Sequence, residues 1–243
     1  VMSFGLILGS FYNVLALRLL KGESPIFPPS HCPRCGHRLG VWDLVPIFSY
    51  LLLRGRCRYC GGRITPIYLV GESLTALSFY LVYRQLGWQW ELLVGWSLAS
   101  LLVLSVLTDL KEHLILDRIT FPILGLFLLL RLVIGEEPWW WYISGGLLGA
   151  LVLLLVAVFS KGGMGGGDIK LYLAVGVALG PGLTLLSILL ASFAGTLIGG
   201  VLMLAGRIRR RQLIPFAPFI WFGALTAYLY GNDLWHWYSG LWS

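Results

Sequence analysis

The chain has 243 residues, of which 58% are hydrophobic and only 12% are charged. Soluble domains carry about 25% charged residues, so this composition excludes an ordinary soluble protein and indicates a polytopic membrane protein. The net charge of +7 would also suit nucleic-acid binding, but in a membrane protein its commoner cause is Lys and Arg in cytoplasmic loops.

Apolar runs long enough to cross a bilayer as helices recur along the whole chain. They predict spans at 1–19, 66–86, 90–108, 117–135, 140–160, 169–181, 183–206 and 214–231. The division between the sixth and seventh spans, at Gly180-Pro181-Gly182, is the least sharply defined. We therefore expect an all-α polytopic membrane protein with about eight transmembrane helices and both termini on one side of the membrane.

Basic residues are distributed unevenly between the two sides of the membrane. Only Arg84 and Arg131 fall on one side, and the other sixteen of the eighteen fall on the opposite side. The larger group comprises Arg18, Lys21, Arg34, Arg38, Arg54, Arg56, Arg58, Arg63, Lys111, Arg118, Lys161, Lys170, Arg207, Arg209, Arg210 and Arg211. The positive-inside rule makes that side cytoplasmic, and the Arg207–Arg211 run is expected to anchor the topology near anionic lipid. We expect an outer aromatic belt of Trp139, Trp140, Trp141, Trp235, Trp237 and Trp242.

All four cysteines lie in the segment 21–65, the long polar loop of the chain. They form two CxxC pairs, Cys32 with Cys35 and Cys57 with Cys60, separated by 21 residues. This spacing is close to that of zinc ribbons, in which four thiolates close a tetrahedral structural site. Disulfides remain an alternative, although the loop is expected on the reducing side, and a redox CxxC is another. His31 and His37 are expected to be bystanders.

The hairpin after the third predicted span carries three carboxylates. Glu112 is flanked by Lys111 and His113 and is expected to be solvated, and Asp117 is expected to cap the next helix. Asp109 instead closes the third span, where the negative end of the helix dipole makes a carboxylate costly. That cost indicates a function for Asp109.

Five glycines precede Asp168 in the run from Gly162 to Leu171. The simpler interpretation is a cytoplasmic glycine-rich turn with a helix-capping aspartate. The alternative is an active site, since ionisable residues beside a span are costly and glycine lets an extended peptide approach the backbone. Two carboxylates held close cannot both ionise, so one can act as a base and the other as an acid on a peptide bond. The sequence offers no Ser/His pair and no HExxH helix for another hydrolase.

These residues resemble type IV prepilin peptidases, which are GxGD intramembrane aspartyl proteases distantly similar to presenilin in that motif. The resemblance extends over nearly the whole chain. Its motifs are Gly165–Leu171, the first-span run Gly9–Val14 with Arg18, the paired CxxC loop, Pro46–Tyr50, Leu53–Cys57, Pro66–Glu72 and Pro215–Phe219. Two positions depart from the family pattern, which has Pro where this chain has Leu20 and Leu116.

The resemblance implies an aspartyl endopeptidase with Asp109 and Asp168 as the catalytic pair and Gly165, Gly167 and Lys170 as supporting residues. It implies removal of the basic leader of prepilins and pseudopilins, after a glycine, at the cytoplasmic face of the bacterial inner membrane. Many members then methylate the new N-terminus with S-adenosylmethionine, and Gly55 and Arg56 lie where the family places a methylation-linked pair. The resemblance also implies a structural zinc ion in the cysteine loop.

The expected organisation is a first span at 1–20, a cytoplasmic zinc-binding loop at 21–65 and a transmembrane aspartyl-protease domain at 66–243. Two other classes of function remain open at this point. A proton-coupled transporter would also use membrane aspartates, but transporters usually show matching broken helices in two halves, and here the glycine break occurs once. The other class is a scaffold whose zinc loop binds nucleic acid. A role at the membrane surface explains the basic residues of that loop equally well, so we expect no nucleic acid as a partner.

Overall fold

The computed structural model describes residues 1–160, 164–207 and 214–240, and this part of the chain is all-α with nine α-helices. The long helices are α1 (Met2–Leu20), α3 (Ile67–Leu86), α4 (Glu91–Glu112), α5 (Asp117–Ile134), α6 (Trp139–Phe159), α7 (Gly166–Leu179), α8 (Pro181–Leu204) and α9 (Ala217–Gly240). The loop between α1 and α3 contains the 3-10 turn η1 (Val41–Asp43) and the short helix α2 (Phe48–Leu52).

The eight long helices lie close to the eight predicted spans. The boundary at Gly180 is confirmed as a break, because Gly180 has a φ of 76° and ends α7 before Pro181 begins α8. The helix α9 continues nine residues past the predicted end at 231. Four helices, α1, α4, α6 and α8, are long and apolar enough on their own to cross a membrane.

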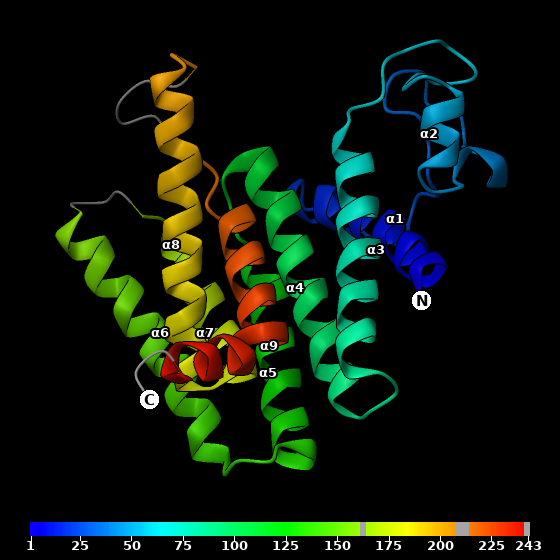
Figure 1. Ribbon diagram of the computed structural model, residues 1–243. Coiled ribbons are helices and arrows are strands. Elements are labelled where there is room, and N and C mark those ends of the chain that lie inside the picture. The colour runs from blue at the N-terminus through cyan, green and yellow to red at the C-terminus, as the bar shows by residue number, and fades with distance from the viewer. Residues whose placement is uncertain (161–163, 208–213, 241–243) are drawn as a thin grey trace.

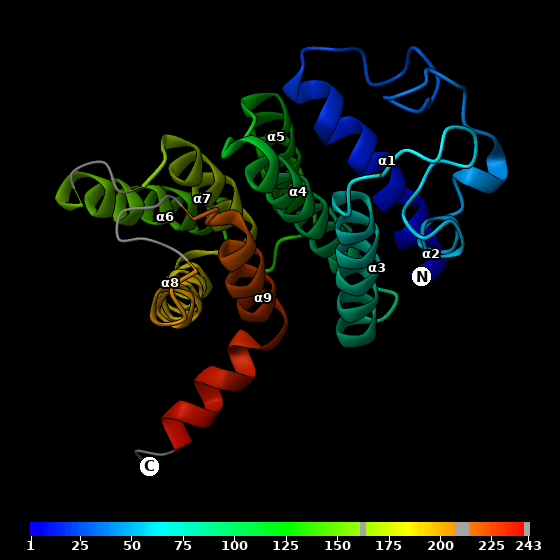
Figure 2. The same cartoon turned by 90° about the horizontal axis from the view of Figure 1, so that it is seen from above.

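The helix α4 lies at the centre of the bundle, and its residues from Leu98 to Asp109 are almost all buried. Figures 1 and 2 show α1, α3 and the loop between them on one side of α4, with α6, α7 and α8 on the other. Small residues let helices approach closely, as is common in membrane bundles. A side chain at Gly9 would meet the Cα of Glu72 at 2.7 Å, and one at Gly223 would meet the carbonyl oxygen of Ser187 at 2.5 Å.

The contact between α6 and α7 is equally close, and it positions the helix that carries Asp168. A Cβ at Gly145 would lie 2.5 Å from the carbonyl oxygen of Gly176. We expect Gly145→Leu to push α7 aside, to lower thermal stability in detergent by about 1–3 kcal/mol, and to reduce cleavage of substrate. Gly182→Leu is the matched control because a Cβ there meets nothing within 4 Å. Equal melting temperatures for the two variants would contradict the importance of this contact.

Arg131, which lies within the predicted span 117–135, is buried in the bundle as part of α5. Its guanidinium donates to Glu91 Oε2 at 2.9 Å, to the carbonyl oxygen of Ala178 at 3.0 Å through Nε, and lies over the ring of Tyr142. The oxygen Glu91 Oε1 accepts from the hydroxyl of Tyr228 at 2.8 Å. This network ties α4, α5, α6, α7 and α9 together near the end of α7 that lies away from Asp168.

The connections after α1, α4, α6 and α8 are the ones predicted to be cytoplasmic, and Figure 1 shows the C-terminal ends of α4 and α8 at one end of the bundle. The connections after α3 and α5 lie at the opposite end in the same view. Several residues used in the sequence analysis lie outside the described part of the chain. They are Lys161, Gly162, Gly163, Arg209, Arg210, Arg211 and Trp242.

Candidate active site and metal centre

Asp109 lies in the last turn of α4, and its carboxylate meets the N-terminus of α9. The backbone N–H of Ala217 donates to Asp109 Oδ2 with an N···O distance of 2.8 Å, and the N–H of Phe216 also acts on this carboxylate. Asp109 is only 7% exposed. The cost of a carboxylate at the end of one helix is therefore offset by the positive end of another.

Asp168 occupies the third position of α7, which begins after Gly165. Its carboxylate accepts a hydrogen bond from the N–H of Gly165, the residue that precedes the helix. This is one half of a capping box. The N-cap itself is Gly165, so Asp168 is not the N-cap residue that the simpler interpretation predicted, although its side chain does bind the end of the helix. Asp168 is 8% exposed and is as buried as Asp109.

The two aspartates therefore share one arrangement: each buried carboxylate rests on backbone amides at a helix N-terminus. The helix α7 contacts both α4 and α9, and the charge of Asp109 acts on Asp168. Two buried carboxylates with mutual repulsion favour a state in which one is protonated and the other ionised. Such a pair can take a proton from water and give one to a leaving amine.

The glycines before Asp168 have different surroundings. A Cβ at Gly167 would lie 2.9 Å from Cβ of Ile115, so Gly167 is needed for packing of α7 against the connection between α4 and α5. A Cβ at Gly165 would come within 3.4 Å of Asp168 Oδ2, and one at Gly166 would meet nothing within 4 Å. The predicted approach of a substrate strand to the backbone therefore has open space at Gly166 and not at Gly167.

Asp117 is not the N-cap that the sequence indicated. Leu116 has the extended backbone of the N-cap, and Asp117 is the first residue of α5. The Asp117 carboxylate instead accepts from Lys170 Nζ at 2.7 and 2.9 Å. Lys170 thereby connects α7 to α5, two residues from Asp168.

Because both side chains of this ion pair are about half exposed, its contribution to stability is small. We expect Asp117→Asn to lower stability by less than about 1 kcal/mol and to keep most of the cleavage activity. A double-mutant cycle with Lys170→Gln, read by thermal unfolding and by cleavage of substrate, measures the pair. Loss of cleavage in Asp117→Asn alone would identify Asp117 as the catalytic carboxylate of the hairpin.

The four cysteines form a compact cluster made by two similar turns. The N–H of Gly36 donates to the carbonyl of Cys32, and the N–H of Gly61 donates to the carbonyl of Cys57, at 2.9 Å in each case. Both glycines have a positive φ, 69° and 67°, which a residue with a side chain rarely adopts. All four cysteines are free thiols, and their sulfur atoms lie within 4.8 Å of one another.

This geometry fits a tetrahedral metal ion. Sulfurs bound to zinc at about 2.3 Å lie about 3.8 Å apart, and Sγ of Cys32 lies 3.9 Å from Sγ of Cys60. The N–H of Cys35 is the main cause that lowers the pKa of Cys32 to about 6. For Cys35 the N–H of His37 works to lower the pKa, but desolvation and the thiols of Cys32 and Cys60 outweigh it and raise the pKa to about 11. A second thiolate beside the first is therefore unfavourable until a cation binds.

The histidines of the loop have other partners. His31 Nδ1 lies 3.0 Å from the carbonyl oxygen of Pro29, and the ring of His37 lies against Tyr59 with centroids 3.6 Å apart. Gly55 also has a structural explanation, because its φ is 67° and a Cβ would lie 2.9 Å from the Tyr50 hydroxyl. Arg56 pairs with Arg63 in an isolated bridge that closes the second cysteine turn.

Sequence reasoning missed the contact between Asp109 and α9. The motif Pro215–Phe219 could have indicated this contact, because proline is favoured at helix starts and the N-terminus of a helix binds carboxylates. It also missed Tyr172, which is fully buried one turn after Asp168 and lies 3.1 Å from the Ser187 hydroxyl.

Two family models and several curated proteins match this chain. Residues 3–86 match the bacterial peptidase A24 N-terminal domain, and residues 96–200 match the type IV leader peptidase family. A prepilin leader peptidase/N-methyltransferase from Bacillus subtilis is 37% identical over 95% of this chain and 93% of its own length. Proteins of the same name from Aeromonas salmonicida and Neisseria gonorrhoeae are each 32% identical, over 98% and 95% of this chain and 92% and 90% of their own lengths. No solved structure matches the chain.

Proposed function

The chain belongs to the type IV prepilin leader peptidase/N-methyltransferase family, peptidase A24, and we propose that Asp109 and Asp168 carry its peptidase activity. Membership makes the chain a prepilin leader peptidase/N-methyltransferase and an aspartyl peptidase, and nothing in the matches favours a transporter. The observation that carries the assignment of the pair is that two buried carboxylates from α4 and α7 each lie on a helix N-terminus and interact with each other.

In the proposed reaction one carboxylate takes a proton from water, and the water oxygen bonds to the scissile carbonyl carbon. The protonated partner donates to the carbonyl oxygen and stabilises the charge that develops there. The carbon–nitrogen bond then breaks as the leaving amine takes up a proton. The leader departs with a new carboxyl group, and the pilin keeps a free N-terminal amine.

Zinc is the metal that the cysteine cluster fits best, with Cys32, Cys35, Cys57 and Cys60 as its four ligands. A site closed by four thiolates has no open position, so the ion would hold the 21–65 loop and would take no part in the cleavage. S-adenosylmethionine is the methyl donor that the relatives' name implies, and its sulfonium would supply a methyl group to the new amine. Gly55 and Arg56 lie in the loop that the family links to this activity.

We further propose eight membrane-spanning helices with the loop 21–65 and the 205–216 connection on the cytoplasmic side of the bacterial inner membrane. In this arrangement the first span is 1–20, the zinc-binding loop is 21–65 and the protease domain is 66–243. The basic leader of a prepilin or pseudopilin would reach the aspartate pair from the cytoplasm, while the apolar part of the substrate stays in the lipid bilayer.

The function is tested by incubating the purified protein in detergent with a prepilin, with and without S-adenosylmethionine. Mass spectrometry should show loss of the leader in both cases and one added methyl group only when the donor is present. Cleavage without methylation would limit the assignment to the peptidase, and an intact prepilin would contradict the assignment as a whole.

A further inference from the structure

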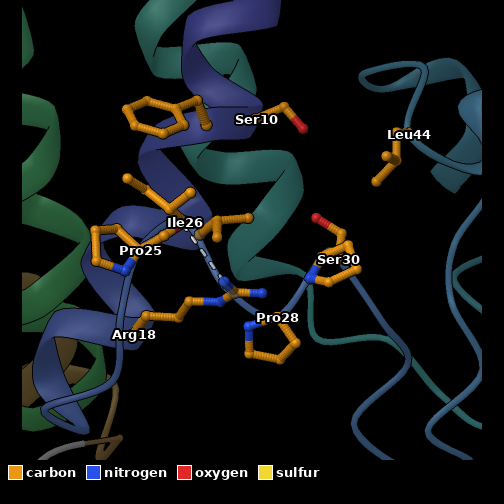
Figure 3. A pocket seen from close by; sticks show the side chains of 10 residues that line it. Ser10, Arg18, Pro25, Ile26, Pro28, Ser30 and Leu44 are labelled. Atoms are coloured by element: carbon orange, nitrogen blue, oxygen red, sulfur yellow. Dashed lines mark hydrogen bonds between the residues drawn. The ribbon is translucent and has the colours of Figure 1, made fainter.

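A cavity of about 240 Å³ lies between α1 and the proline-rich segment 25–30 of the zinc loop (Figure 3). Ser10, Phe11, Val14 and Arg18 of α1 line one wall, and Pro28 and Ser30 lie opposite. These α1 positions form one face of the helix. The cavity thus lies beside the metal cluster, since Ser30 is two residues from Cys32.

The first-span motif, Gly9–Val14 with Arg18, presents two faces of α1, and neither face carries Asp109 or Asp168. One face packs on the bundle: Gly9 lies against Glu72, and the amide of Asn13 donates to the carbonyl oxygen of Tyr68 at 2.8 Å. The other face, with Ser10, Val14 and Arg18, opens to the cavity. The motif therefore builds a second site, apart from the peptidase residues.

Arg18 is the charged group of this cavity, and it is 9% exposed. Its Nη1 donates to the carbonyl oxygens of Ser24 and Pro25 at 3.2 and 3.4 Å, and these are its hydrogen bonds within the described residues. Figure 3 shows the side chain reaching from α1 to the segment that carries Pro25, Pro28 and Ser30. A guanidinium has five N–H donors in a fork that matches a carboxylate, so most of its donors are free for a ligand.

A buried carboxyl group, that of Glu72, lies behind the opposite end of the cavity, where Ser10 is. The hydroxyl of Ser10, about 12 Å from Arg18 along the helix at 1.5 Å per residue, interacts with the buried carboxylate of Glu72. Glu72 Oε2 also accepts from the N–H of Ile47 at 2.7 Å, which fixes the carboxylate under the loop. The cavity therefore suits a ligand that has an anionic end and a cationic centre, in preference to a simple anion.

We propose that this cavity binds the amino-acid end of S-adenosylmethionine, with Arg18 holding the carboxylate and the cationic groups directed towards Ser10 and Glu72. The inference rests on the proposed N-methyltransferase activity. The donor has a carboxylate, which matches the guanidinium of Arg18, and an ammonium and a sulfonium, which suit the end where the Glu72 carboxyl lies behind Ser10. The volume is below the range of about 300–1,000 Å³ for whole drug-sized ligands, so the adenosine part lies outside it.

The test measures binding by calorimetry to the purified full-length protein in detergent. The probes are S-adenosylhomocysteine, which has the amino-acid end, and 5′-methylthioadenosine, which lacks it. Arg18→Gln should weaken binding of the first about 10- to 100-fold, the range expected for a charged hydrogen bond, and should leave the second unchanged. Lys21→Gln, which alters an exposed basic residue one turn further on, is the matched control and should bind both as the wild type does.

A second variant keeps the inference testable if Arg18→Gln fails to fold. Val14→Phe fills the cavity from α1 and keeps Arg18, so it should also weaken the binding of S-adenosylhomocysteine at least tenfold, while the zinc content stays at one ion per chain.

Binding of S-adenosylhomocysteine that neither variant changes from the wild-type value would overturn this inference and leave the proposed function intact. Failure of the wild type to bind S-adenosylhomocysteine would overturn both the inference and the methyltransferase assignment. If Arg18→Gln instead removes co-purified anionic lipid and leaves S-adenosylhomocysteine binding unchanged, the cavity is a headgroup site and the inference is wrong.

Discussion

Replacing Asp168 or Asp109 with Asn should abolish cleavage of a prepilin, with a loss of at least about 10³-fold in rate. Asn keeps the shape and the acceptor oxygen that contacts Gly165 or Ala217, but it cannot exchange a proton. Because each carboxylate is buried at a helix N-terminus, the Asn variants should fold with melting temperatures near that of the wild type. The measurement is initial cleavage rate by mass spectrometry, with thermal unfolding in detergent as the folding check.

Glu112→Gln is the matched control for this prediction. Glu112 lies three residues after Asp109 at the end of the same helix and is exposed. The Glu112→Gln variant should therefore retain most of the cleavage activity. Full cleavage by Asp109→Asn with loss in Glu112→Gln or Asp117→Asn would show that another carboxylate of the hairpin is catalytic. Methylation of a pre-cleaved pilin should survive both Asn variants, because that step does not need the water activated by the pair.

Each Cys→Ser change in the cluster should remove most of the bound zinc, from one ion per chain to near zero in metal analysis. Structural zinc sites contribute about 10–16 kcal/mol of binding free energy in small domains, and the loop 21–65 has few other buried apolar groups. We therefore expect Cys57→Ser to make this loop sensitive to protease in detergent. Cleavage should persist at a reduced level, since the aspartate pair lies on α4 and α7 and the loop lies beside α1 and α3.

His31→Gln is the control for the metal prediction, because His31 is adjacent to Cys32 but contacts Pro29. It should keep one zinc per chain. Absence of zinc from freshly purified, reduced wild-type protein would contradict the metal assignment, and equal zinc loss in His31→Gln would show that the ligand set is wrong.

The positions of the helices could be predicted from sequence because each apolar run is bounded by glycine, proline or charge. The break at Gly180 and the start of α5 after the Asp109 hairpin follow from such local signals. The helix α9 continues past the predicted end because Asn232, Asp233 and His236 lower its apolar character without breaking the helix.

Contacts between distant segments could not be predicted in the same way. The hydrogen bond from Ala217 to Asp109 joins residues 108 positions apart, and the pairing of Asp117 with Lys170 joins residues 53 positions apart. The partners of Arg131 could not be predicted either, because sequence alone does not show that Glu91 and Ala178 lie beside it. The family resemblance predicts the residues of the site, and the structure adds which helix termini contact the two aspartates.

The cleavage rates of Asp109→Asn, Asp168→Asn and the double variant, measured on one prepilin in one detergent, test the central claim most directly. If the two carboxylates act as one unit, both single variants and the double variant should share the same residual rate. Measurable cleavage by Asp168→Asn, or a double variant whose loss equals the product of the two single losses, would contradict a catalytic pair of Asp109 and Asp168.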